Sequence, residues 1–173
     1  MGAALTIEHR AFPLRPAPVT PVPFKGTYRE AGWQRCGQMS AADGITLTPW
    51  PHATMPNWSL PALEAAKCAA AQGDALFERV HRALYEAYFT KSLNIAEPRV
   101  VADLVAAAGA DMARYAADLE SGAPREAVVK DYEAASAEGV RAIPTVIAPE
   151  TGRALVGLAD ATTYRAAVEE AAG

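Results

Sequence analysis

The feature that most constrains this chain is a run of helical segments, each bounded by residues that start or stop helices. Five such segments are predicted in succession, over residues 60–72, 74–89, 98–109, 111–122 and 124–139. Prolines stand in the first turn of three of them, and glycines end or directly follow four, as expected for helix starts and helix ends. Ser59 and Asp111 are candidate N-caps. A further helix is predicted over 27–43, with Gly44 as its stop.

Strand patterns occur on both sides of this helical block. The predicted strands are 5–12, 144–148 and 153–157. The first alternates apolar and polar residues, and the last two flank a short turn that predicts a hairpin. A final helix over 162–172 is expected, capped by Asp160 or Thr162. Strands at both ends with helices between them indicate an α/β layer interrupted by a helical insertion.

Two irregular stretches connect these elements. Residues 13–23 contain five prolines, which forbid both a helix and a central strand, so we expect an extended connector. Residues 45–59 form a long loop containing Trp50 and His52. Long loops in compact domains are often functional, so these two side chains could line a ligand groove. The alternative is that the tryptophan simply packs.

Composition excludes several classes of protein. The chain has 173 residues, a net charge of −4 and no basic block, which argues against nucleic-acid binding. Without an apolar run long enough to span a membrane, or a secretory leader, the expected location is the cytoplasm, where thiols stay reduced.

The cysteines and histidines suggest no reactive centre. Cys36 and Cys68 form neither a Cys-x-x-Cys motif nor a zinc spacing, and both fall inside predicted helices. Low-pKa thiols need an electropositive, accessible position, so we expect structural cysteines. The three histidines are scattered without other ligands at useful spacing, so we expect no metal.

Pro144 precedes the buried-looking strand of GVRAIPTVI, residues 139–147. Sheets tolerate proline at the first residue of a strand, which is the simpler interpretation. The bond between Ile143 and Pro144 is also one of the few kinds of peptide bond that can be cis at modest cost.

Three passages together resemble the DsbA-like thioredoxin-fold family. They are IEHRAFPLRP at 7–16, the helical pair at 59–89 and the stretch from GVRAIPTVI to RALVG at 139–157. The likeness favours FrnE-type proteins and the 2-hydroxychromene-2-carboxylate isomerase branch, which is the kappa-class glutathione transferase branch. It implies one α/β domain over 1–173 with a thioredoxin-like fold. The thioredoxin-like part would be 1–24 and 139–173, with an all-helical insertion at about 25–138.

The resemblance also implies where a substrate lies. The matching proline is cis in thioredoxin-like folds, and the backbone of the residue before it, here Ile143, meets an extended peptide or a small thiol substrate. The family places a reactive Cys-x-x-Cys, or a serine in the isomerase branch, in a βα unit that precedes the strand matched by 5–12. This sequence lacks that unit, so we expect an N-terminally incomplete fold: a truncated product, a chain that pairs with another copy, or a rearranged relative.

Three functions therefore remain open. The first is a thiol-disulfide oxidoreductase of the DsbA/FrnE type without dithiol activity in this chain, so that no catalytic residue is assigned. The second is a glutathione-dependent isomerase or transferase. The third is a non-catalytic binding module or a homodimer scaffold. No resident cofactor is expected, apart from glutathione under the second hypothesis.

Overall fold

The computed structural model describes residues 5–41 and 43–173, which divide into two compact units. One unit joins the chain up to Phe12 with Lys130–Gly173, and the other is Pro13–Val129. The connector at 13–23, which the sequence placed in the thioredoxin-like part, lies in the helical unit. Hydrogen bonds explain this assignment, since Val19 N–H donates to the Asn57 carbonyl and Phe24 N–H to that of Ala53.

The helical unit contains every helix predicted between residues 27 and 122, with ends shifted by a few residues. Its helices are α1 (Tyr28–Ala41), α2 (Leu60–Gln72), α3 (Asp74–Tyr85), the π-helix η1 (Glu86–Thr90), α4 (Pro98–Ala107) and α5 (Met112–Ser121). Helix α6 (Ala123–Ala137) starts in this unit and ends in the other. Residue 42, at the predicted end of the first helix, lies outside the described residues.

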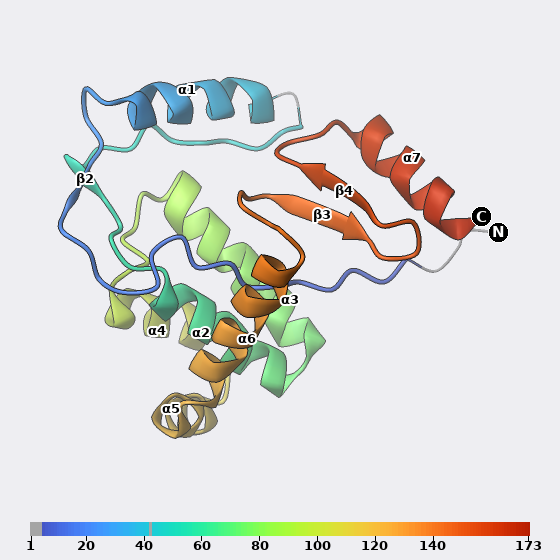
Figure 1. Cartoon of the computed structure of the whole chain (residues 1–173). Helices are drawn as coiled ribbons and strands as arrows, with labels where there is room; N and C mark the ends of the chain where they lie inside the picture. Colours follow the sequence, from blue (N-terminus) through green and yellow to red (C-terminus); the bar gives the residue numbers. More distant parts are fainter. Residues whose placement is uncertain (1–4, 42) are drawn as a thin grey trace. The chain divides into compact units, whose positions relative to one another are not determined.

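Helices α2 to α5 enclose the main apolar core of this unit (Figure 1). Its fully buried members are Ala65, Cys68, Ala69, Val80, Val101 and Val105. The alanines of α2 leave room for neighbouring helices to approach closely, which explains why an alanine-rich helix can sit inside a core. Burial, rather than intrinsic helix propensity, supplies most of the stability of such helices.

The two predicted N-caps behave differently. Asp111 caps α5 as expected, because its carboxylate accepts hydrogen bonds from the N–H groups of Ala113 and Arg114, each at 3.0 Å. Ser59 is the N-cap residue of α2, as predicted, but its side chain makes no capping hydrogen bond. Its hydroxyl oxygen instead accepts a hydrogen bond from Arg15 N–H at 3.0 Å, and its own N–H donates to the Arg15 carbonyl at 2.9 Å. The serine therefore fastens the proline-rich connector.

A short antiparallel ladder was not expected from the sequence. Strand β1 (Val22–Pro23) pairs with β2 (Thr54–Met55), so the connector and the long loop each contribute two residues to a sheet. Pro23 is compatible with this position because a two-stranded ladder consists entirely of edges. The pairing links residues about thirty positions apart, which local patterns do not report.

The predicted helix 74–89 changes pitch near its end. Residues Glu86–Thr90 form a π-helix, in which Lys91 N–H donates to the Glu86 carbonyl at 2.9 Å. The neighbouring rings of Tyr88 and Phe89 both contact Trp33, with ring centroids 5.3 Å away in each case. The wider turn lets the consecutive residues Tyr88 and Phe89 both pack against Trp33. Helical periodicity in the sequence does not indicate this contact.

The other unit contains the predicted hairpin and the predicted last helix. Strand β3 (Thr145–Ala148) pairs with β4 (Arg153–Val156), and α7 (Ala161–Ala172) runs beside them (Figure 1). Asp160 is the N-cap of α7, and its carboxylate accepts a hydrogen bond from Thr163 N–H at 2.7 Å. Among the described residues of this unit, only Ala11 and Ala167 are buried apolar residues, so the hairpin has little core of its own.

The strand predicted at 5–12 is wrong. The described chain has no ladder partner for this segment, and the side chains of Leu5 and Ile7 are 61% and 67% exposed. Near the end of the segment, a side chain takes the place of a ladder partner: Ala11 N–H donates to a carboxylate oxygen of Asp131 at 2.7 Å. Alternation indicates an extended backbone, but a strand also requires a neighbour to receive its hydrogen bonds.

Candidate functional site

The candidate site starts at the segment that leads into β3. The peptide bond between Ile143 and Pro144 is cis, as the family resemblance implied, and the Ile143 side chain is 46% exposed. Two hydrogen bonds hold this segment. Gly157 N–H donates to the Pro144 carbonyl at 2.8 Å, and the Thr145 hydroxyl donates to the Ala142 carbonyl at 2.7 Å. The entry to β3 is therefore fixed while its surface stays accessible.

The outer edge of β3 has unpaired backbone groups. Among the described residues, β3 has β4 as its one neighbour, in a sheet of two strands. Residues along an antiparallel strand point their N–H and C=O groups alternately toward and away from the partner. Because the Pro144 carbonyl accepts a hydrogen bond from Gly157 N–H, directly after β4, the N–H and C=O groups of Thr145 and Ile147 point away from β4. This edge can accept another extended backbone.

The register of the hairpin sorts its side chains onto two faces. Thr145 is opposite Val156, and Ile147 is opposite Ala154, so these four share one face, which we call the open face. The other face includes Arg153, whose guanidinium lies 2.6 Å from the Glu170 carboxylate of α7. The helix therefore lies on the face away from the four residues of the open face.

A hollow of about 160 Å³ lies on the open face. Its walls are the four residues of the open face and the segment Glu138–Ala142 that follows α6. Val156 is 67% exposed, and Ala154 is also exposed. Because side chains alternate between the two faces of a strand, PTVIA and RALVG each place every second residue on one face, but only the register shows which residues meet.

The two cysteines occupy different environments and form no disulfide. Cys68 is fully buried, and this desolvation, reinforced by the nearby charges of Asp118 and Glu64, raises the pKa of its thiol to about 12. A thiol of this kind is a poor nucleophile. Cys36 is exposed on α1, so the expected role as a packed structural cysteine applies to Cys68 and not to Cys36.

The two residues predicted for a groove contact each other but differ in exposure. The Trp50 ring is 2% exposed, and its Nε1–H donates to the Thr54 carbonyl at 2.9 Å. His52 is exposed; its ring lies 5.0 Å from that of Trp50, and its Nε2 is 3.0 Å from the Ser92 carbonyl. Trp50 thus packs into the cluster around Trp33, which leaves His52 as the accessible member of the pair.

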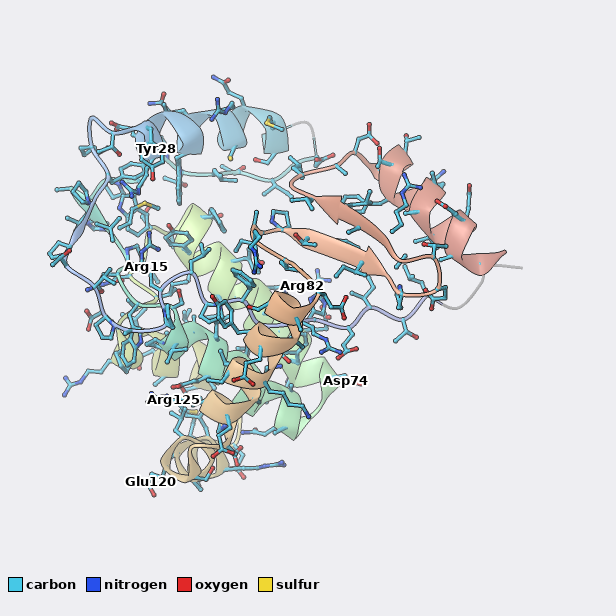
Figure 2. All side chains as sticks on the ribbon, in the orientation of Figure 1. Arg15, Tyr28, Asp74, Arg82, Glu120 and Arg125 are labelled. Atoms are coloured by element: carbon cyan, nitrogen blue, oxygen red, sulfur yellow. The ribbon has the colours of Figure 1, made fainter. Side chains whose placement is uncertain are left out.

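A second hollow, of about 280 Å³, lies in the helical unit where α5 meets α6. Its lining includes Glu64, Glu120 and Arg125, the last two labelled in Figure 2. The Arg125 guanidinium forms an ion pair with the nearly buried Glu64 carboxylate. The hydrogen bond to this carboxylate, and its charge, raise the pKa of Arg125 further above its ordinary value. No local pattern indicates this pair, because its members are 61 positions apart.

Metal binding and membrane crossing each require a recognisable arrangement of side chains. Within residues 5–41 and 43–173, no three His, Cys, Asp or Glu side chains come together in a way that could hold a metal ion. None of the helices in the described part of the chain combines the length and the apolar character needed to cross a membrane.

The fold and the site define a thioredoxin-like α/β protein with a large helical unit. The sequence matches the DSBA-like thioredoxin domain over residues 3–169. Because this match spans nearly the whole chain, the protein belongs to the DsbA-like thioredoxin domain family. No curated protein matches the sequence.

Solved structures from two bacteria are similar to this chain. A protein described as a probable DsbA oxidoreductase from Streptomyces coelicolor has a TM-score of 0.77 at 21% identity, with 95% of this chain and 74% of that chain covered. A candidate protein disulfide isomerase from Nitrosomonas europaea has a TM-score of 0.72 at 11% identity, with 87% and 76% covered. At identities this low, the likeness concerns the fold alone.

Proposed function

We propose that this chain is the substrate-binding body of a DsbA-like thiol-disulfide oxidoreductase. An extended polypeptide lies with its backbone beside Ile143 and Pro144 and continues along the outer edge of β3. The observation that carries this proposal is the set of outward backbone groups of Thr145 and Ile147, directly after the exposed Ile143. Addition of a strand to an open sheet edge is a common way to bind peptides.

We further propose that the two cysteines of this chain perform no dithiol turnover. Dithiol exchange needs a thiolate that can attack and a second thiol that can resolve the mixed disulfide. The sequence has no Cys-x-x-Cys motif, and Cys68 is buried with a strongly raised thiol pKa. Both cysteines are free, which suits the reducing cytoplasm expected from the sequence.

A peptide titration monitored by backbone amide NMR tests the binding site. With an unstructured peptide as the probe, we expect the largest shift changes at the amides of Thr145 and Ile147. The variant Ile147→Pro removes one outward N–H and should weaken binding. Ala154→Pro is the matched control, because the Ala154 N–H points to the far edge of β4. Equal binding by both variants, or shifts confined to the helical unit, would overturn the assignment.

An insulin-reduction assay tests whether this chain catalyses dithiol exchange. We expect no acceleration over the uncatalysed reaction with dithiothreitol, and the same result for Cys36→Ser. Robust turnover by the unmodified chain would refute it. A calorimetric titration with millimolar glutathione separates this function from the glutathione-dependent isomerase alternative, which requires measurable heat of binding.

A further inference from the structure

The hollow of about 280 Å³ where α5 meets α6 is lined only by residues of the helical unit, so a role for it does not rest on the proposed function. Three helices contribute charged groups to it: Glu64 comes from α2, Glu120 from the last turn of α5 and Arg125 from the first turn of α6. Leu119 and Pro124 add apolar surface. The lining thus places two carboxylates, one guanidinium and a small apolar wall around one space.

One carboxylate oxygen of Glu64 is available to a ligand. The Glu64 side chain is only 10% exposed, and its Oε1 accepts a hydrogen bond from Arg125 Nε–H. Its Oε2 accepts no hydrogen bond from the described residues and is not sealed from solvent, so a donor that enters the hollow can reach it. A nearly buried carboxylate oxygen without a donor has lost most of its water, which favours any ligand that supplies an N–H group.

The end of α5 adds further negative charge to the hollow. The Glu120 carboxylate is exposed and forms no ion pair with the residues that the structure describes (Figure 2). The Glu120 carbonyl also accepts no hydrogen bond from them, because the residue four positions on is Pro124, which has no N–H to donate. Free carbonyl groups give the C-terminal end of a helix a partial negative charge. A positively charged group is therefore favoured beside Glu64 and Glu120.

The start of α6 supplies the opposite charge. Arg125 donates to Glu64 through Nε–H, which leaves the N–H groups of Nη1 and Nη2 without an acceptor among the described residues. The backbone N–H of Arg125 has no acceptor there either, as is usual in the first turn of a helix. A guanidinium and a free N–H at a helix start both favour a carboxylate. A simple anion would be repelled by the two glutamates, and a simple cation by Arg125.

The volume and the apolar wall limit the rest of the ligand. One water occupies about 30 Å³ of liquid, so 280 Å³ corresponds to roughly nine non-hydrogen atoms. Leucine and smaller α-amino acids fit within this size, whereas tryptophan and glutathione exceed it. The small apolar surface of Leu119 and Pro124 favours an aliphatic side chain, which gains free energy by leaving water.

We infer that this hollow is a binding site for a free α-amino acid with an aliphatic side chain no larger than that of leucine. The ammonium group of the ligand lies between Glu64 Oε2 and the Glu120 carboxylate, and its carboxylate meets the free N–H groups of Arg125. The ammonium and carboxylate of an α-amino acid are attached to one carbon. This short separation matches the charges of the site, since the Glu64 carboxylate and the Arg125 guanidinium are already in contact.

Backbone amide NMR with L-leucine as the probe tests this inference. We expect saturable shift changes at the amides of Gly122 and Arg125. L-leucine amide lacks the carboxylate, N-acetyl-L-leucine lacks the ammonium group, and L-tryptophan exceeds the volume, so none of the three should bind. Equal binding by leucine and any of these compounds would overturn the recognition of a small zwitterion. Absence of saturable shifts at tens of millimolar leucine would overturn the site itself.

Charge-removing variants locate the ligand. Glu120→Gln should weaken leucine binding about tenfold, through loss of one charge-assisted contact. Glu126→Gln is the matched control, because it removes the same charge from an exposed position of α6 outside the lining, where solvent and salt screen it, and should change affinity about twofold or less.

A double variant, Glu64→Gln with Arg125→Gln, replaces both members of the ion pair, so that neither charge is left buried alone, and should abolish binding. Circular dichroism verifies that each variant is folded. Equal losses in Glu120→Gln and Glu126→Gln, or retained binding by the folded double variant, would overturn the assignment.

Discussion

The unequal cysteines give the sharpest prediction, which concerns their reaction with Ellman's reagent. Burial and neighbouring carboxylates raise the pKa of Cys68 to about 12. At about pH 8 its thiolate fraction is then on the order of 10⁻⁴, against about a quarter for a thiol with an ordinary pKa near 8.5. Since thiolate is the reactive form, this effect alone slows Cys68 by about three orders of magnitude. The zero exposure of Cys68 slows it further.

Stopped-flow absorbance in native buffer should therefore show one fast thiol per chain. Cys36→Ser should eliminate the fast phase, whereas Cys68→Ala should retain it. In concentrated guanidinium, the wild-type chain should release two equivalents at once. Two fast thiols in the native protein, or a fast phase that survives in Cys36→Ser, would refute the assignment of Cys68 to the core and weaken the argument against dithiol turnover.

Three further predictions concern stability. Trp33→Ala removes a ring that contacts four other aromatic side chains and should lower the free energy of unfolding by about 3–5 kcal/mol in urea titrations, with Trp33→Phe intermediate; a change near zero would contradict the packing. Asp111→Ala should cost about 1 kcal/mol through loss of the α5 cap, and Asp111→Asn should restore most of it. The hydrogen bond from Thr163 N–H lowers the pKa of Asp160 in the folded state. The ionised Asp160 therefore contributes its full stabilisation above about pH 3.8, the ordinary pKa of the carboxyl group, and loses it as the pH falls through the lowered pKa of the folded state. The stability difference between wild type and Asp160→Ala should therefore shrink in acid, and a constant difference would be evidence against the cap.

Much of the fold could be predicted from local signals. Helix ends followed from prolines and glycines, because these residues act within one turn of the chain. For example, Gly122 ends α5 with a positive φ of 77°, where a residue with a side chain is strained. The hairpin and α7 followed from a turn and a cap, which are equally local.

The candidate site was predictable only in part. Pro144 and Ile143 were identified through the resemblance, whereas the hollow beside them depends on which residues of β3 and β4 stand opposite each other. The groove suggested by Trp50 and His52 could not be judged from the loop alone. Whether a tryptophan faces a ligand or a core depends on rings that are distant in sequence, here Trp33 and Tyr88.

The sequence by itself determined the positions of the helices, the hairpin and the proline that precedes β3. The tertiary structure alone decided that residues 5–12 form no ladder, that the Ser59 hydroxyl bonds to Arg15 rather than to the first turn of α2, and that Cys68 is buried while Cys36 is exposed. Helix starts and turns depend on backbone preferences within a few residues. Strand pairing, burial and the pKa of a thiol instead depend on groups that only folding brings together.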